Sequence, residues 1–240
     1  IFTFPEVHQD AQLEITFHRT LRIPDDGNTY PLPPGLGSFP LRHVEDFANN
    51  VPSKWMEHGG VMMPMYQSEA LWISFESTYL TRHGTEYPFA VKIATGKVNA
   101  VTGDSWRNTL NDNPQDYMVV PNQPWIDGYC IEKDIIRQFV AMPLGSGYTA
   151  EEQLTGSADH GGIQIIVYPM NRSVFDEKFP ERDIEHLDRL VMCCACAPEY
   201  DSAPDMGLAP GGKMEQEIYE DPFAFNDWER GISSRCFVHL

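Results

Sequence analysis

Two periodic segments and one continuous apolar run predict β-strands. Apolar residues occupy every second position over residues 13–17, which is typical of a half-buried strand. The same alternation runs over residues 89–93, and further apolar residues follow the turn at 95–97, so this segment predicts a hairpin. The uninterrupted apolar run at residues 163–168 predicts a central strand that is buried on both faces.

Helical spacing is clear in two short segments near the middle of the N-terminal half. Apolar residues fall three and four positions apart over residues 44–51, which predicts an amphipathic helix that Pro52 ends. A second helical turn is expected over residues 53–58, ending at Gly59. Both helices are short, because proline or glycine interrupts each pattern.

In the second half of the chain, two segments predict helices and a third is compatible with a helix or a strand. Thr149 and Glu152 form the pattern of a capping box, so a short helix begins there. Residues 131–140 carry apolar side chains at helical spacing, although their β-branched content leaves a strand open from Ile135 onward. The strongest pattern covers residues 181–196, and a proline follows it.

Together these elements predict an α+β fold. Strands and helices do not alternate regularly, so we expect a mixed, largely antiparallel sheet with three or four short helices. Residues 1–197 form the predicted domain. Residues 198–240 are acidic and contain several prolines and glycines, so they are expected to form an irregular C-terminal arm that docks on the domain through its aromatic residues.

Charge excludes one class of partner. The chain of 240 residues has 35 acidic and 17 basic residues, a net charge of −18. Nucleic-acid binding depends on neutralising phosphates with cations, so DNA and RNA are not expected partners. No apolar run approaches the roughly 20 residues that a membrane-spanning helix needs, so no membrane span is expected. Five cysteines, three of them clustered, favour reduced thiols and a cytoplasmic location.

Two groups of residues allow a thiol- or metal-dependent enzyme, either a hydrolase or an oxidoreductase. Cys193 and Cys196 have the C-x-x-C spacing, but they fall at the C-terminal end of the predicted helix, where the dipole raises a thiol pKa. Packing in the core is the alternative interpretation of Cys193 and Cys196. Cys130 and His160 form a conceivable catalytic pair, although their flanking residues match no known signature.

Methionines and aromatic residues concentrate between residues 55 and 72. Soft methionine side chains beside aromatic rings can line an apolar ligand site. The predicted ligand-binding residues are Trp55, Met63, Met65, Tyr66 and Trp72. Core packing is the alternative reading of the same residues. No metal or cofactor is predicted, because alternation along a strand would separate the methionines that could bind copper.

Five stretches resemble a family of uncharacterised, mainly microbial proteins. They are residues 30–41 (YPLPPGLGSFPL), 61–72 (VMMPMYQSEALW), 114–128 (PQDYMVVPNQPWIDG), 136–147 (IRQFVAMPLGSG) and 233–239 (SSRCFVH). The resemblance covers most of the chain from residue 30 onward, and it implies no catalytic residue and no activity.

The hypothesis that best fits the sequence is a soluble, acidic, non-catalytic module that binds a small molecule or a protein partner. It rests on the density of methionine and aromatic residues and on the lack of a catalytic motif. The thiol- or metal-dependent enzyme is the alternative.

Overall fold

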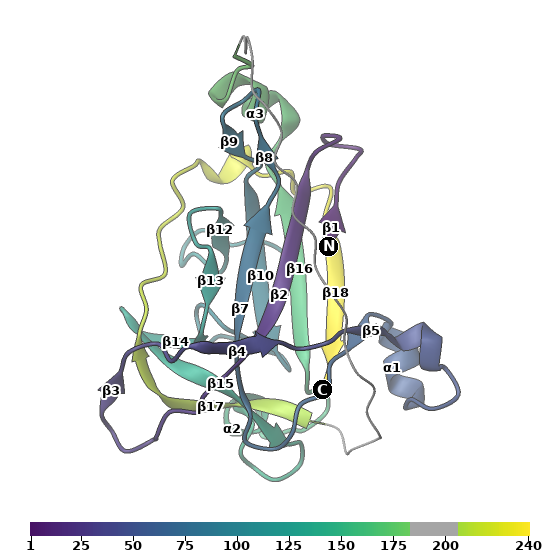
Figure 1. Ribbon diagram of the computed structural model, residues 1–240, viewed down its shortest axis with the longest axis vertical. Helices are drawn as coiled ribbons and strands as arrows, with labels where there is room; N and C mark the ends of the chain where they lie inside the picture. The colour runs from purple at the N-terminus through teal and green to yellow at the C-terminus, as the bar shows by residue number, and fades with distance from the viewer. Residues whose placement is uncertain (183–205) are drawn as a thin grey trace.

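The protein is mainly β. The computed structural model describes residues 1–182 and 206–240, and strands make up 41% of it against 12% helix (Figure 1). The predicted α+β class is therefore wrong. In the described part the chain forms two large sheets and three α-helices, and one sheet curls like half of a barrel.

A nine-stranded sheet contains the strand order β1-β2-β7-β15-β17-β3, and β4, β13 and β14 pair with β2, β7 and β15. Its strands are β1 (Phe2–Thr3), β2 (Gln12–Thr20), β3 (Thr29–Tyr30), β4 (Gly35–Ser38), β7 (Ala70–Ser77), β13 (Trp125–Ile126), β14 (Gly128–Glu132), β15 (Ile135–Pro143) and β17 (Met206–Glu215). Figure 1 shows the curl: β2 and β7 run vertically, whereas β15 and β17 cross below them.

A seven-stranded sheet has the order β11-β10-β16-β18-β6-β5, and β12 also pairs with β10. Its strands are β5 (Arg42–His43), β6 (Val61–Met62), β10 (Phe89–Thr95), β11 (Val98–Asn99), β12 (Met118–Val120), β16 (Ile163–Pro169) and β18 (Ser234–His239). A separate small hairpin joins β8 (Tyr79–Leu80) to β9 (Thr85–Glu86).

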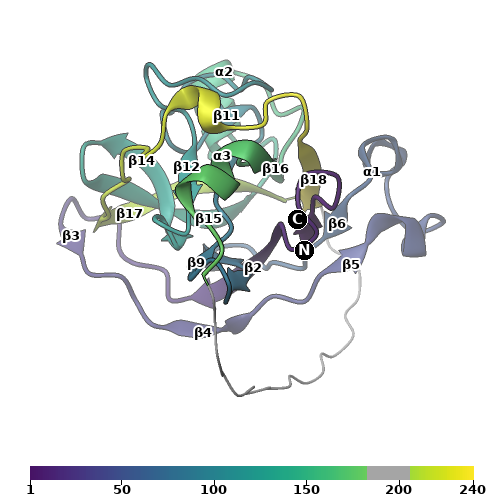
Figure 2. The same ribbon diagram turned by 90° about the horizontal axis from the view of Figure 1, so that it is seen from above.

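The helices lie at the margins of the two sheets (Figure 2). They are η1 (Val44–Phe47), α1 (Ser53–His58), α2 (Ala150–Thr155), α3 (Arg172–Lys178) and η2 (Phe225–Asp227), where η denotes a 3-10 helix. In the described part, no helix has both the length and the apolar character that crossing a membrane requires.

The two sheets share one hydrophobic core. Leu13, Ile15 and Phe17 of β2 belong to the same buried cluster as Val91 and Ile93 of β10. Each set alternates along its strand, so the residues between them face away from this contact. Every residue of β10 and β16 is buried, so both faces of the seven-stranded sheet are covered along these two strands.

The helix predicted over residues 131–140 is a hairpin of β14 and β15. The two strands pair antiparallel, with Tyr129 opposite Arg137, and Asp134 takes the positive φ of 61° that the turn needs. The apolar spacing fits a helix as well as a hairpin, so periodicity could not separate them. The β-branched residues, which made a strand from Ile135 onward an alternative prediction, indicated the structure that forms, strand β15.

The irregular C-terminal arm is also a wrong prediction, because β17 and β18 lie inside the two sheets. β17 pairs with β15 along most of its length. Its glycines allow close approach: a Cβ on Gly211 would lie 2.6 Å from Cγ2 of Val140, and one on Gly212 would lie 2.2 Å from the carbonyl oxygen of Pro24. The glycine content of this segment suggested irregular chain, but in the structure these glycines allow close packing of a strand.

Several local predictions are confirmed. Strand β2, the hairpin of β10 and β11, and the doubly buried strand β16 form as expected. α1 ends at Gly59, and α2 begins with the predicted capping box, in which Thr149 Oγ1 accepts a hydrogen bond from Glu152 N. The helix expected over residues 44–51 is shorter and is the 3-10 helix η1. The helix predicted over 181–196 falls almost entirely within residues 183–205, which lie outside the described residues. The predicted domain boundary at 197 also falls there.

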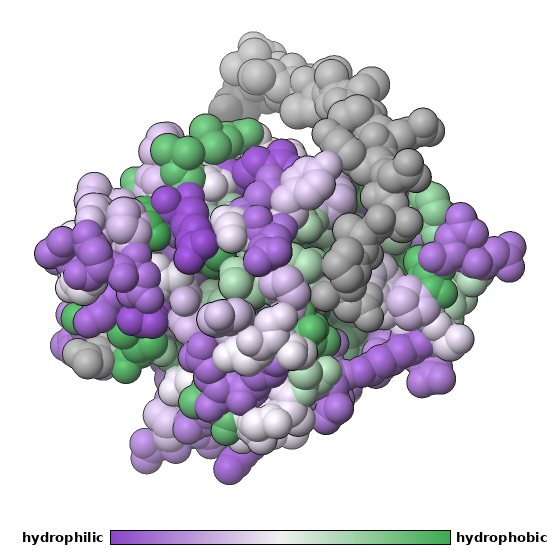
Figure 3. All heavy atoms as spheres, turned by 90° about the horizontal axis from the view of Figure 1, so that it is seen from below, coloured by the Kyte–Doolittle hydropathy of each residue, from purple (hydrophilic) through white to green (hydrophobic). Residues whose placement is uncertain are grey.

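The surface is rich in carboxylates. Seen from below, hydrophobic residues form small patches between hydrophilic ones (Figure 3). Some cations are paired, as in Arg19 with Glu69 at 2.9 Å and Arg137 with Asp25 at 3.3 Å. Because acidic residues outnumber basic ones by 35 to 17, about half of the carboxylates have no cation of their own. A cation that lies away from carboxylates is therefore unusual in this chain.

Candidate functional site

The five predicted ligand-binding residues occupy different environments. Met63 and Met65 are buried in the shared core, with exposed fractions of 1% and 5%. Tyr66 is 65% exposed. Trp72 points away from that core on β7, where its ring stacks on His18 of β2 with 3.9 Å between centroids. Trp55 lines a cavity, so it is the member of the set that carries the site described below.

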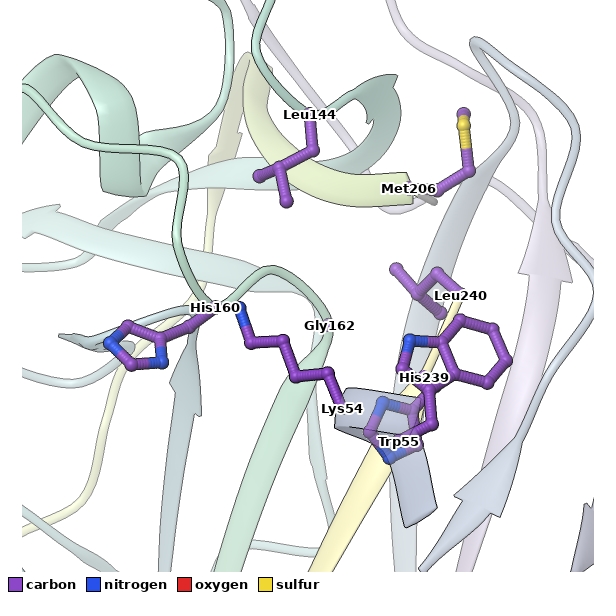
Figure 4. Close-up of a pocket in the computed structure, with 8 residues that line it drawn as sticks. All are labelled: Lys54, Trp55, Leu144, His160, Gly162, Met206, His239 and Leu240. Carbon is purple, nitrogen blue, oxygen red and sulfur yellow. The ribbon is translucent and has the colours of Figure 1, made fainter. Parts of the chain in front are cut away.

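The cavity lies where five separate segments meet (Figure 4). It has a volume of about 30 Å³ and opens to solvent. Its lining residues are Lys54, Trp55, Leu144, His160, Gly162, Met206, His239 and Leu240. α1 supplies the first two, the loop before β16 supplies His160 and Gly162, and the ends of β15, β17 and β18 supply the others.

Two glycines make this meeting of segments possible. Gly60 follows α1 with φ of 96°, and a Cβ there would lie 2.2 Å from the carbonyl oxygen of Phe237 in β18. Gly162 precedes β16 with φ of 58°, and a Cβ there would lie 2.5 Å from the carbonyl oxygen of Val238. Larger residues would separate both loops from β18, because positive φ and close backbone contact each favour glycine.

Trp55 is fixed against the end of β18. Its ring stacks on His239, with centroids 4.6 Å apart and planes at 20°. Nε2 of His239 lies 2.9 Å from the carbonyl oxygen of Gly59, so this nitrogen is the donor and carries the proton. The stack and the hydrogen bond hold the imidazole and the indole in one orientation, which gives the cavity a rigid wall.

The opposite wall carries amine and imidazole groups. Figure 4 shows the Lys54 side chain extending toward His160 and Gly162. Burial lowers the pKa of His160, and the charges of Lys97 and Lys54 lower it further, against the opposing effect of Glu151. The carboxylate of Glu151 is already bonded, since it accepts from His160 N at 3.0 Å and from Gly161 N at 2.8 Å. None of the lining side chains is acidic.

The predicted thiol–imidazole pair is not brought into one cavity. Cys130 lines a second, open cavity of about 290 Å³, together with Lys133, Asp134, Glu217, Ile218 and Glu220, whereas His160 lines the first. Burial raises the pKa of the Cys130 thiol, and the nearby charge of Asp134 raises it further. A raised pKa keeps the thiol protonated at neutral pH and lowers its reactivity.

The remaining predictions for catalysis and metal binding concern the C-x-x-C pair and clusters of metal-binding side chains. Cys193 and Cys196 lie outside the described residues. Within the described ranges 1–182 and 206–240, no three His, Cys, Asp or Glu side chains form a group that could hold a metal ion.

Sequence reasoning missed most of this site. Lys54, Leu144, Met206, His239 and Leu240 belong to four different segments, and none carries a motif. The usable signal was Gly59-Gly60 directly after α1, which showed that the chain turns sharply beside Trp55. It did not show which strand the turn meets.

Asp127 is a separate buried carboxyl that makes the fold sensitive to pH. Its side chain is 2% exposed; Oδ2 accepts from Trp125 Nε1 at 2.9 Å, and Oδ1 has no hydrogen-bond partner. Burial raises the pKa of Asp127 from 3.8 to about 7, against the lowering effect of the Trp125 hydrogen bond. Between these values the unfolded chain releases the proton that the folded protein keeps, so the free energy of unfolding falls as pH rises through this window.

Asp127→Asn removes this titration and is expected to stabilise the protein at alkaline pH. The gain in the free energy of unfolding over the unmodified protein is expected to be about 1–3 kcal/mol larger at pH 8 than at pH 5. Urea unfolding at both pH values measures it, with Asp159→Asn at an exposed position as the control. A gain that does not change with pH would show that Asp127 is ionised in the folded protein.

Comparison with known proteins gives no family for this chain. No protein-family model matches it, and neither does any curated protein or solved structure.

Proposed function

We propose that this protein is a non-catalytic binding module for a small molecule with an apolar part, and that the cavity beside Trp55 is its site. One observation carries the proposal: the cavity has an apolar wall and a polar wall. Trp55, Leu144, Met206 and Leu240 supply the apolar groups, and Lys54 supplies an ammonium group. Ligand sites combine apolar lining with a few placed polar groups in this way.

The competing enzyme hypothesis has weaker support. A thiol hydrolase needs a thiolate next to a base. Cys130 has a raised pKa, and it lines a different cavity from His160. A thiol-alkylation assay tests the reactivity of Cys193 and Cys196, which lie outside the described part.

The binding partner could instead be a protein, which is the second candidate. For either partner we propose a cytoplasmic location. Cys236 carries a free thiol that is partly buried. Free thiols persist in reducing compartments, so this residue supports the cytoplasm. The small size of the cavity favours a small molecule over a protein as the occupant of this particular site.

A ligand screen on two variants tests the proposed function. Ligand-observed NMR with a panel of small neutral and charged organic compounds is expected to find compounds that bind the unmodified protein and are recovered unchanged. Trp55→Ala is expected to weaken their binding at least about tenfold. Tyr66→Ala is the matched control, because it removes an exposed aromatic ring of the same segment.

Leu144→Trp provides an independent test if Trp55→Ala disturbs folding, because it fills the cavity from another segment. Binding that survives both variants would overturn the proposed site. Chemical conversion of a bound compound would overturn the non-catalytic assignment.

A further inference from the structure

We infer that the cavity beside Trp55 recognises a small monocarboxylate, whose carboxylate group binds the ammonium group of Lys54. This inference rests on the proposed function and adds the chemical class of the ligand. It follows from the charge, the shape and the size of the cavity.

The charge of the lining is the first argument. Lys54, His160 and His239 all line the cavity, and none of the lining side chains is acidic. In a chain with 35 acidic and 17 basic residues, random placement favours carboxylates around any cation. An ammonium group next to the imidazole of His160 creates a local site for an anion on a protein whose net charge is −18.

Lys54 is available for an external anion. Within the described part of the chain it forms no ion pair, whereas Lys92 and Lys178 are paired with Asp116 and Asp227. The neighbouring carboxylate of Glu151 accepts two backbone N–H groups, at 3.0 Å and 2.8 Å, so its charge is already stabilised by hydrogen bonds. An incoming carboxylate is therefore the natural partner of the Lys54 ammonium group.

The arrangement of the walls specifies the rest of the ligand. In Figure 4, Met206 and Leu240 lie across the cavity from the Lys54 ammonium group, and Leu144 lies between the two sides. Met206 and Leu240 are almost fully buried, at 5% and 7% exposure, so this wall is held in place by the core. A ligand that binds both walls has a negative group at one end and an apolar group at the other.

Size separates a carboxylate from bulkier anions. A cavity holds a water-sized group for roughly every 10–15 Å³, so about 30 Å³ accepts about two such groups. The enclosed part of the cavity therefore takes only one end of the ligand, such as the two oxygen atoms of a carboxylate, and the apolar group lies in its open mouth. A phosphate ester brings more oxygens and a second charge. With a single lysine in the lining, one negative charge is neutralised and a dianion is not.

Isothermal titration with butyrate and butyramide tests the inference. The two compounds have nearly the same shape, and only butyrate is charged at neutral pH. We expect butyrate to bind at least about tenfold more tightly than butyramide, and the difference to shrink as salt screens the charge. Lys54→Met is expected to abolish the difference, while Lys54→Arg retains part of it because the positive charge remains.

Lys133→Met is the matched control, because Lys133 lines the other cavity. Lys54 is exposed, so its substitution is not expected to impair folding. If butyrate and butyramide bind equally, or if butyrate binding survives Lys54→Met, the inference is wrong while the proposed binding function stands. If phosphate displaces butyrate, the ligand class is wrong. If no compound in the screen depends on Trp55, the proposed function itself fails.

Discussion

Asp116→Ala is expected to lower the free energy of unfolding by about 3–5 kcal/mol, because it leaves a buried ammonium group without its partner. Lys92 lies in the middle of β10 and its side chain is completely buried. Its Nζ lies 2.6 Å from Oδ2 of Asp116 and also donates to the carbonyl oxygen of Thr109. Burial lowers the pKa of Lys92, against the raising effect of the hydrogen bond to Asp116.

The same pair fixes a long connection of the fold. Oδ1 of Asp116 accepts from Asn111 N at 2.9 Å, and Asn99 donates to the backbone carbonyl of Asp116 at 2.8 Å. The loop between β11 and β12 is thereby closed over the outer face of the seven-stranded sheet. Loss of the carboxylate is expected to expose this loop as well as to destabilise the lysine.

Urea unfolding measures the effect, and Asp176→Ala is the control. Asp176 pairs with Arg172 at 3.5 Å on α3, but both side chains are about half exposed or more, so its loss is expected to cost less than about 1 kcal/mol. Replacing both buried partners, as in Lys92→Met with Asp116→Leu, is expected to recover much of the loss. Equal costs for the buried and the exposed pair would show that Lys92 is neutral or hydrated in the folded protein.

Asp221→Ala is the second variant with a large expected effect, about 2–4 kcal/mol of lost stability. Its Oδ2 accepts two side-chain hydrogen bonds, from Tyr117 OH at 2.6 Å and from Trp228 Nε1 at 2.7 Å, and Oδ1 accepts from Phe223 N at 2.8 Å. Tyr117 and Trp228 are both 1% exposed. Burial raises the pKa of Tyr117, so the hydroxyl remains a donor and would lose its acceptor.

This carboxylate ties the segment between β17 and β18 to the rest of the protein. Asp221 N also donates to Gln115 Oε1 at 2.8 Å, and Tyr219 N donates to Gln123 Oε1 at 3.0 Å. Urea unfolding gives the loss of stability, and limited proteolysis reports whether residues 216–228 become accessible. Asp221→Asn keeps one acceptor oxygen and is expected to cost less than alanine. Unchanged stability and unchanged proteolysis in Asp221→Ala would show that shape alone docks this segment.

Local sequence patterns predicted the elements that short-range physics determines. The alternation in β2 and the capping box at Thr149 depend on neighbouring residues, and both form as expected. The hairpin after Thr95 likewise depends on a short turn. The pattern over residues 131–140 failed because a helix and a hairpin bury the same isoleucines, and the pairing of β15 with β14, β17 and β7 selects the strand.

Local patterns predicted even less of the candidate site. The sequence selected Trp55 because aromatic and methionine residues surround it, yet Met63 and Met65 enter the core and Trp72 stacks on His18. The cavity is instead completed by His239, which lies 184 positions after Trp55. No local pattern links these two residues, because they meet through the parallel pairing of β6 with β18.

By itself, the sequence determined the excess of negative charge, the lack of a recognisable catalytic motif and the strands and capped helix that depend on adjacent residues. Tertiary structure decided the mainly β class, the place of β17 and β18 inside the sheets, and the composition of the cavity. The reason is that apolar periodicity records only that a side chain is buried. Which strand or loop buries it depends on long-range pairing and on close backbone contacts such as that of Gly60 with Phe237.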